Sequence, residues 1–126
     1  MFYPCKVLIV EDSPTSRFFM KKALEEAGYQ VITATDGSEG LMKYVQEQPD
    51  CIILDVVLPG VSGFSVCRQL RALDADGHLP IILVSVKSTL MDHSWGLRQG
   101  ADRYLPKPLS QEVLIQAVEE VLAKHL

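Results

Sequence analysis

Four short apolar runs of this chain end in side chains that could take part in metal or phosphate chemistry. The runs are KVLIVED, CIILD, PIILVS and RYLPKP, and the polar residues at their ends are Glu11, Asp12, Asp55, Ser85 and Lys107. Each run reads as a buried strand, and the carboxyl ends of parallel strands lie at the same edge of a sheet. We therefore expect three carboxylates, a hydroxyl and an ammonium group to meet in one crevice.

The types of these residues indicate phosphoryl transfer. An oxygen-only ligand set without His or Cys suits a hard cation, and Mg²⁺ usually takes one or two carboxylates together with water and phosphate oxygens. A cation on one side of a phosphoryl group and Lys107 on the other would stabilise the charge during transfer. Asp55 could act as the nucleophile, because aspartyl phosphate formation is an established kind of covalent catalysis. Each residue alone has a plain structural explanation, such as a helix start at Asp12, so the prediction depends on their joint occurrence.

Five strand-like segments alternate with segments of helical periodicity, which is typical of a parallel sheet with helices on both faces. The segments are Val7–Val10, Val31–Ala34, Ile52–Leu54, Ile81–Val84 and Tyr104–Leu105. Because 126 residues fill one domain, we predict a single flavodoxin-like, doubly wound α/β domain over residues 1–126, with five helices. The strand order 2-1-3-4-5 is taken from known sheets of this class, and it would place Glu11 and Asp12 opposite Asp55.

Capping residues and apolar periodicity set the helix boundaries. The first helix is expected to have Ser13 as N-cap and Pro14 at its first position, and to end at Gly28. The helix from about Ser88 to Gln99 has the least clear apolar stripe. The residues expected to face the sheet from the first two helices are Phe19, Met20, Ala23, Leu24, Ala27, Leu41, Tyr44 and Val45.

Composition excludes several classes of protein. The formal net charge of −4 and the lack of a long basic cluster argue against nucleic-acid binding. No apolar stretch reaches the ~20 residues of a membrane span, and the N-terminal run is too short for a signal peptide, so we predict a cytoplasmic protein without membrane insertion. The three cysteines lack CxxC spacing, which indicates neither a disulfide framework nor a zinc site.

The segments VLIVEDS, ILDVVLPGVSG, LVS and YLPKP resemble the signature blocks of the response-regulator receiver domain, and the resemblance covers essentially the whole chain. It implies the following roles, named by the numbers of this sequence: Glu11 and Asp12 as acidic metal-site residues, Asp55 as phosphoacceptor, Ser85 as switch hydroxyl, Tyr104 as rotating aromatic and Lys107 as phosphate partner. The backbone carbonyl of Val57 is implied as a further Mg²⁺ ligand, and the peptide bond before Pro108 is implied to be cis.

The stretch SWGLRQGADRYLPKP is further similar to single-domain receivers of type IV pilus, twitching-motility and chemosensory systems. Two positions depart from the common family pattern. Ser85 replaces a threonine but keeps the hydroxyl. Val86 stands where the family usually has a small residue, and its bulk beside the acyl phosphate is expected to slow hydrolysis rather than to change the chemistry.

The resemblance implies a stand-alone response regulator, which is not an enzyme beyond its own phosphorylation and dephosphorylation. It would accept phosphate from a histidine kinase or phosphotransfer domain. It would then bind a downstream protein through the face made by the fourth helix, fifth strand and fifth helix. The alternative is a receiver that works without phosphorylation. Such a receiver would be expected to lack one of the acids or the lysine, and this chain has them all. A flavodoxin-like flavin carrier is disfavoured, because Glu11 and Asp12 would repel a flavin phosphate.

Overall fold

The computed structural model describes residues 4–124, so residues 1–3 and 125–126 of the predicted domain lie outside the described residues. Five strands and five helices alternate along the chain. The strands are β1 (Lys6–Val10), β2 (Gln30–Ala34), β3 (Cys51–Asp55), β4 (Ile81–Ser85) and β5 (Arg103–Pro106). The helices are α1 (Pro14–Glu26), α2 (Gly37–Glu47), α3 (Gly63–Leu73), α4 (Leu90–Arg98) and α5 (Gln111–Lys124).

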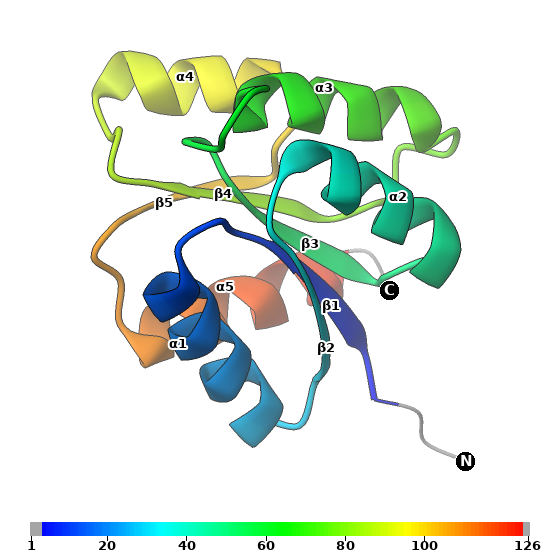
Figure 1. Ribbon diagram of the computed structural model, residues 1–126, viewed down its shortest axis with the longest axis vertical. Helices are drawn as coiled ribbons and strands as arrows, with labels where there is room; N and C mark the ends of the chain where they lie inside the picture. Colours follow the sequence, from blue (N-terminus) through cyan, green and yellow to red (C-terminus); the bar gives the residue numbers. More distant parts are fainter. Residues whose placement is uncertain (1–3, 125–126) are drawn as a thin grey trace.

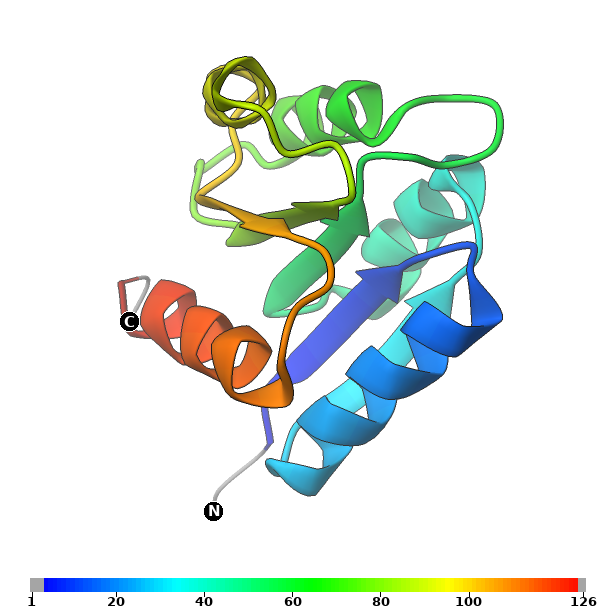
Figure 2. The same cartoon turned by 90° about the vertical axis from the view of Figure 1, so that its left-hand side faces the viewer.

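The strands form one parallel sheet in the order β2-β1-β3-β4-β5, which confirms the predicted flavodoxin-like fold and strand order. Helices α1 and α5 cover one face of the sheet, and α2, α3 and α4 cover the other (Figures 1 and 2). Val10 pairs with Leu54 in the ladder between β1 and β3, so the residues that follow Val10 lie beside Asp55. The register thus sets the first and third strand ends next to each other.

Alternate residues of the strands contribute their side chains to two hydrophobic cores, one on each face of the sheet. Val7 and Ile9 of β1 belong to the core beneath α1 and α5, whereas Leu8 and Val10 belong to the core beneath α2 and α3. All four side chains are buried, as expected for a central parallel strand that is covered on both faces. The central strands therefore form a rigid base for the residues at their carboxyl ends.

Side-chain caps begin the helices that follow the strands. Ser13 accepts a hydrogen bond from the backbone N–H of Ser16 at 3.3 Å. Thr89 and Asp92 form a reciprocal capping box at the start of α4, so this helix begins at Leu90 rather than near Ser88. None of the helices that the structure describes has the length and apolarity needed to cross a bilayer.

Three of the predicted buried positions are wrong. Phe19, Ala27 and Val45 are exposed, although Met20, Ala23 and Leu24 are buried as expected. The sheet-facing stripe of α1 is narrower than the apolar pattern suggested, because only Met20, Ala23 and Leu24 of this helix are buried. Phe19 and Val45 therefore belong to the surface.

Candidate functional site

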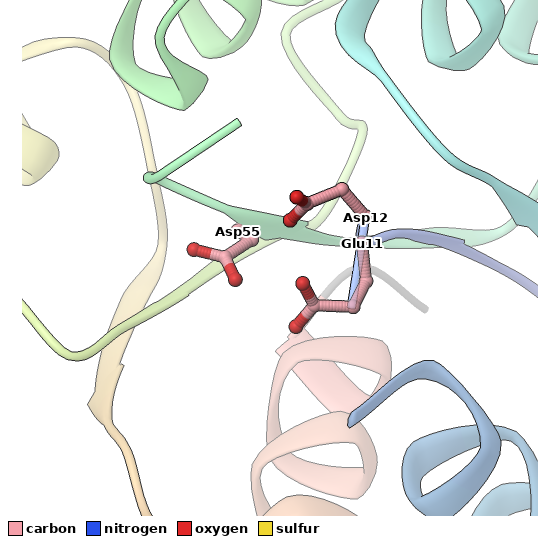
Figure 3. A group of neighbouring side chains, drawn as sticks. All are labelled: Glu11, Asp12 and Asp55. Carbon is pink, nitrogen blue, oxygen red and sulfur yellow. The ribbon is translucent and has the colours of Figure 1, made fainter. Parts of the chain in front are cut away.

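Three carboxylates converge at the carboxyl edge of the sheet. Glu11 and Asp12 follow directly after β1, and Asp55 is the last residue of β3. One ligand oxygen of each lies within 4.8 Å of the others, and the three side chains point toward a common space (Figure 3). Glu11 and Asp55 are buried, whereas Asp12 is exposed. The structure thus brings together the three acids predicted to meet.

Lys107 joins two of these acids from the far side of the crevice. Its Nζ donates a hydrogen bond to Asp55 Oδ2 at 2.6 Å and another to Glu11 Oε1. The residue comes directly after β5, and its backbone N–H donates to the carbonyl of Ser85 at 2.9 Å. The Lys107–Pro108 peptide bond is cis, as the resemblance implied. The ammonium group is therefore held beside the carboxylate of Asp55.

The pKa of Asp55 is raised to about 6. Burial is the largest cause and the neighbouring Glu11 carboxyl adds to it, while hydrogen bonds from Lys107 and the Val57 backbone act in the opposite direction. The Val57 N–H donates to Asp55 Oδ1 at 2.8 Å and so fixes the orientation of the carboxylate. At neutral pH most of this carboxylate remains ionised, as a nucleophile requires.

Glu11 and Lys107 stabilise each other's charged forms. Burial raises the pKa of Glu11, but hydrogen bonds from Lys107 and neighbouring groups outweigh it, and the net pKa is lowered. Burial likewise lowers the pKa of Lys107, but hydrogen bonds to Asp55 and Glu11 raise it overall. The crevice therefore keeps a cation beside two acids.

The donor set fits a hard divalent cation. It consists of carboxylate oxygens only, and the three acids offer oxygens close enough together to share one ion. Such an oxygen-only cluster is the kind of ligand set that Mg²⁺ takes in proteins. Glu11, Asp12 and Asp55 would hold the ion, and the carbonyl of Val57 remains a predicted fourth ligand.

Ser85 and Tyr104 do not belong to the acid cluster, but both form hydrogen bonds with the backbone of Lys87. Ser85 is buried at the end of β4, and its Oγ accepts a hydrogen bond from the Lys87 N–H at 3.0 Å. The Tyr104 hydroxyl donates to the Lys87 carbonyl, and its ring is buried without a phosphoryl group on Asp55. The expectation that this rotating aromatic starts from an exposed orientation is therefore wrong, because the ring already packs beneath α4. The predicted hydroxyl and aromatic residue therefore both contact the backbone of the loop after β4. Val86 lies in this loop and is exposed, and its expected effect on hydrolysis stays a prediction.

Two residues that support the site were not predicted from the sequence. Gly63 at the start of α3 lies so close to the strand end that an added Cβ would be 2.1 Å from the Asp55 carbonyl oxygen. Arg17 donates from Nη1 to the carbonyl oxygens of Glu11 at 2.9 Å and of Asp12 at 3.2 Å. A glycine directly after the Ser62 cap was a usable signal for the first, since glycine is a poor helix former. Nothing in the sequence pattern singled out Arg17.

Residues 7–119 match the family of the response regulator receiver domain, and the chain belongs to this family. PilH of Pseudomonas aeruginosa is 41% identical over 118 residues, which are 94% of this chain and 98% of PilH. The transcriptional regulatory protein AfsQ1 of Streptomyces coelicolor is 39% identical over 118 residues, but the chain spans only 51% of that protein.

The chemotaxis response regulator CheY4 of Vibrio cholerae has a similar structure, with a TM-score of 0.89 and 33% identity over 94% of this chain and 99% of CheY4. Membership of the receiver family means that the chain is not an enzyme beyond the chemistry of its own phosphorylation. The family partners histidine kinases in two-component signalling. The acidic pocket is consistent with a phosphorylation site.

Proposed function

We propose that residues 1–126 form a stand-alone response regulator that accepts a phosphoryl group on Asp55 from a histidine kinase or phosphotransfer domain. The observation that carries this proposal is the ammonium of Lys107 at 2.6 Å from Asp55 Oδ2, beside an acid cluster suited to Mg²⁺. The match to PilH over nearly its whole length supports a single-domain regulator.

In the proposed reaction, a carboxylate oxygen of Asp55 attacks the phosphorus of a phosphohistidine. An O–P bond forms, the P–N bond breaks, and the imidazole leaves with the electron pair. Lys107 stabilises the negative charge of the phosphoryl oxygens, and the Val57 N–H holds the carboxylate in place. A bound Mg²⁺ would supply further charge stabilisation for these oxygens.

The output of the proposed regulator is a change in protein binding. Ser85 is the group that phosphoryl oxygens would draw toward Asp55, and Tyr104 is the aromatic residue that would report this on the face made by α4, β5 and α5. Phosphorylation can shift such an equilibrium only through its differential interaction with the two states, and Ser85 and Lys107 would supply that difference. The similarity to PilH and CheY4 favours a role in pilus motility or taxis.

The test is intact-mass spectrometry after incubation with acetyl phosphate or a phosphorylated kinase. One phosphoryl group should appear with Mg²⁺ present, and it should be lost with a chelator and in Asp55→Asn. Asp50→Asn is a matched control, because Asp50 lies at the opposite end of β3. Equal labelling of Asp55→Asn and the parent would refute Asp55 as the phosphoacceptor. A parent protein that takes up no phosphoryl group under any of these conditions would favour the phosphorylation-independent interaction module.

A further inference from the structure

Helix α4 exposes apolar side chains on the flank that faces α3. Leu90 is 88% exposed, Met91 82% and Trp95 47%. Helices α3 and α4 lie side by side over the same face of the sheet in both views (Figures 1 and 2). A groove of about 560 Å³ lies along this flank, with Phe64 of α3 in its wall. Several neighbouring apolar side chains with this much exposure are typical of an interaction surface.

We call this surface the α3–α4 groove. Its lining includes Phe64, Lys87, Leu90, Met91, Trp95 and Arg98. It differs from the face formed by α4, β5 and α5. Leu97 is 52% exposed but does not line the groove, so it serves as a marker for another side of the same helix.

The charges along the groove favour an acidic ligand. Lys87 precedes α4 and Arg98 ends it, so the two cations stand at opposite ends of the groove. Within residues 4–124 neither of them forms an ion pair. The acid in the lining, Asp92, accepts hydrogen bonds from the N–H of Thr89 at 3.0 Å and from its hydroxyl at 2.9 Å. The charge of Asp92 is thus directed at its own helix start and toward Lys87, and two cations against one acid leave the groove with a net positive charge.

The groove is also connected to the candidate switch residues. Lys87 is hydrogen-bonded through its N–H to Ser85 and through its carbonyl to Tyr104. The Tyr104 ring lies against the wall of the groove, with its centroid 6.4 Å from that of Phe64. A movement of Ser85 toward a phosphoryl group would remove the acceptor of the Lys87 N–H and alter one end of the groove.

We propose that the α3–α4 groove binds an acidic amphipathic helix of a partner protein, with an affinity that phosphorylation of Asp55 changes. Such a helix places apolar residues at i, i+3, i+4 and i+7 against Met91, Trp95 and Phe64. Its acidic residues pair with Lys87 and Arg98 at the two ends. The dependence on phosphorylation rests on the proposed function, whereas the groove itself does not.

Trp95 is the single tryptophan of the chain and lines the groove, so its fluorescence reports directly on binding. The probe is a designed helical peptide with leucines at i, i+3, i+4 and i+7 and glutamates between them. Its control is the same peptide with lysines in place of the glutamates. We expect the acidic peptide to shift Trp95 emission to the blue and to bind about tenfold more tightly than the basic peptide.

Matched variants locate the peptide on α4. Met91→Ser should weaken binding of the acidic peptide severalfold, while Leu97→Ser should leave it within about twofold. Arg98→Glu should weaken the acidic peptide by about tenfold and strengthen the basic one. No emission shift, equal affinity for the two peptides, or an equal loss in Leu97→Ser would overturn the proposed groove.

The same titration on phosphorylated protein separates this inference from the proposed function. Phosphorylation is measured independently by intact mass, and we expect the peptide affinity to change at least threefold between the two forms. If Asp55 is phosphorylated and the affinities are equal, the coupling is wrong. If the peptide binds as expected and Asp55 never accepts phosphate, the groove stands and the proposed function fails.

Discussion

Helices α5 and α4 cover opposite faces of the sheet near β5, yet they are attached to it very differently (Figure 2). Helix α5 buries four apolar side chains, Leu114, Ala117, Val118 and Val121. Helix α4 buries only Gly96 and exposes Leu90 and Met91. A helix with little buried apolar surface opens or shifts at low free energy, whereas a firmly packed helix moves only with the whole domain. We therefore expect α5 to stabilise the fold and α4 to change position more easily.

The carboxylate crevice, like α5, is firmly held in place. Lys107, Glu11 and Asp55 are joined by hydrogen bonds, and within residues 4–124 no buried side-chain nitrogen or oxygen lacks a partner. Fixed charges of this kind suit a site for phosphoryl transfer, since positioned groups need little rearrangement during the reaction. We therefore expect the chemical site to be rigid and the neighbouring α4 to respond.

The largest expected difference comes from removing matched leucines from the two helices. Leu114→Ala should lower the free energy of unfolding by about 2–5 kcal/mol, because its side chain is fully buried. Leu90→Ala should change it by less than about 0.5 kcal/mol, because its side chain is already in water. Urea denaturation of both variants measures the contrast, and similar losses would remove the distinction between the helices.

A second prediction tests the rigidity of the crevice. Gly63→Ala should destabilise the protein by about 3 kcal/mol, because the new Cβ would overlap backbone atoms of Asp55 and Val56. Gly60→Ala is the control. Gly60 has φ 78° but open space around it, so only backbone strain of about 1 kcal/mol is expected. An equal effect of both substitutions in denaturant melts would mean that the crevice backbone yields easily.

The contact between α4 and the aromatic residue gives a third prediction. An alanine at Gly96 would place its Cβ 2.7 Å from Tyr104 Cδ2 and 2.9 Å from Leu83 Cδ1. We expect Gly96→Ala to cost about 1–2 kcal/mol, less than a clash in the crevice, because α4 can shift outward. The Tyr104 ring resonances should move with it. Unchanged Tyr104 resonances in the variant would show that α4 does not control this ring.

The smallest expected effect is a gain in stability in Asp55→Asn. The pKa of Asp55 in the folded protein is raised from its ordinary 3.8 to about 6. The raised pKa means that the folded protein favours the protonated form of Asp55. The stability that this protonated carboxyl contributes is therefore complete below about pH 4 and is lost as pH rises through about 6. Without a cation at pH 7.5, Asp55→Asn should be more stable than the parent by about 1 kcal/mol.

Thermal melts from pH 4 to pH 8 test this sign. Mg²⁺ should stabilise the parent at pH 7.5 and act much less on Asp55→Asn. Glu11→Gln should show no such gain, because its pKa is lowered by the Lys107 hydrogen bond and its contribution is present above its ordinary pKa. A variant at Asp55 that is less stable than the parent at pH 7.5 would contradict the description of the crevice.

The sequence predicted the fold and the acid cluster because both depend on strand ends. Apolar runs marked the strands, and a parallel sheet brings Glu11, Asp12 and Asp55 to one edge whatever the details of the loops. The burial of Phe19 was predicted wrongly, because a helical apolar stripe does not reveal how much of it the sheet can cover. The hydrogen bonds of Lys87 were not predictable, since they join backbone atoms of a loop to residues of two other strands.

We propose that the rigid crevice is coupled to the loosely packed α4 through Ser85, Lys87 and Tyr104. Amide hydrogen exchange before and after phosphorylation with acetyl phosphate and Mg²⁺ tests it most directly. We predict changed protection in residues 86–98 and around Tyr104, with α5 unchanged, and a smaller change in Ser85→Ala. Changes confined to α1 and α2, with α4 and Tyr104 silent, would contradict the account.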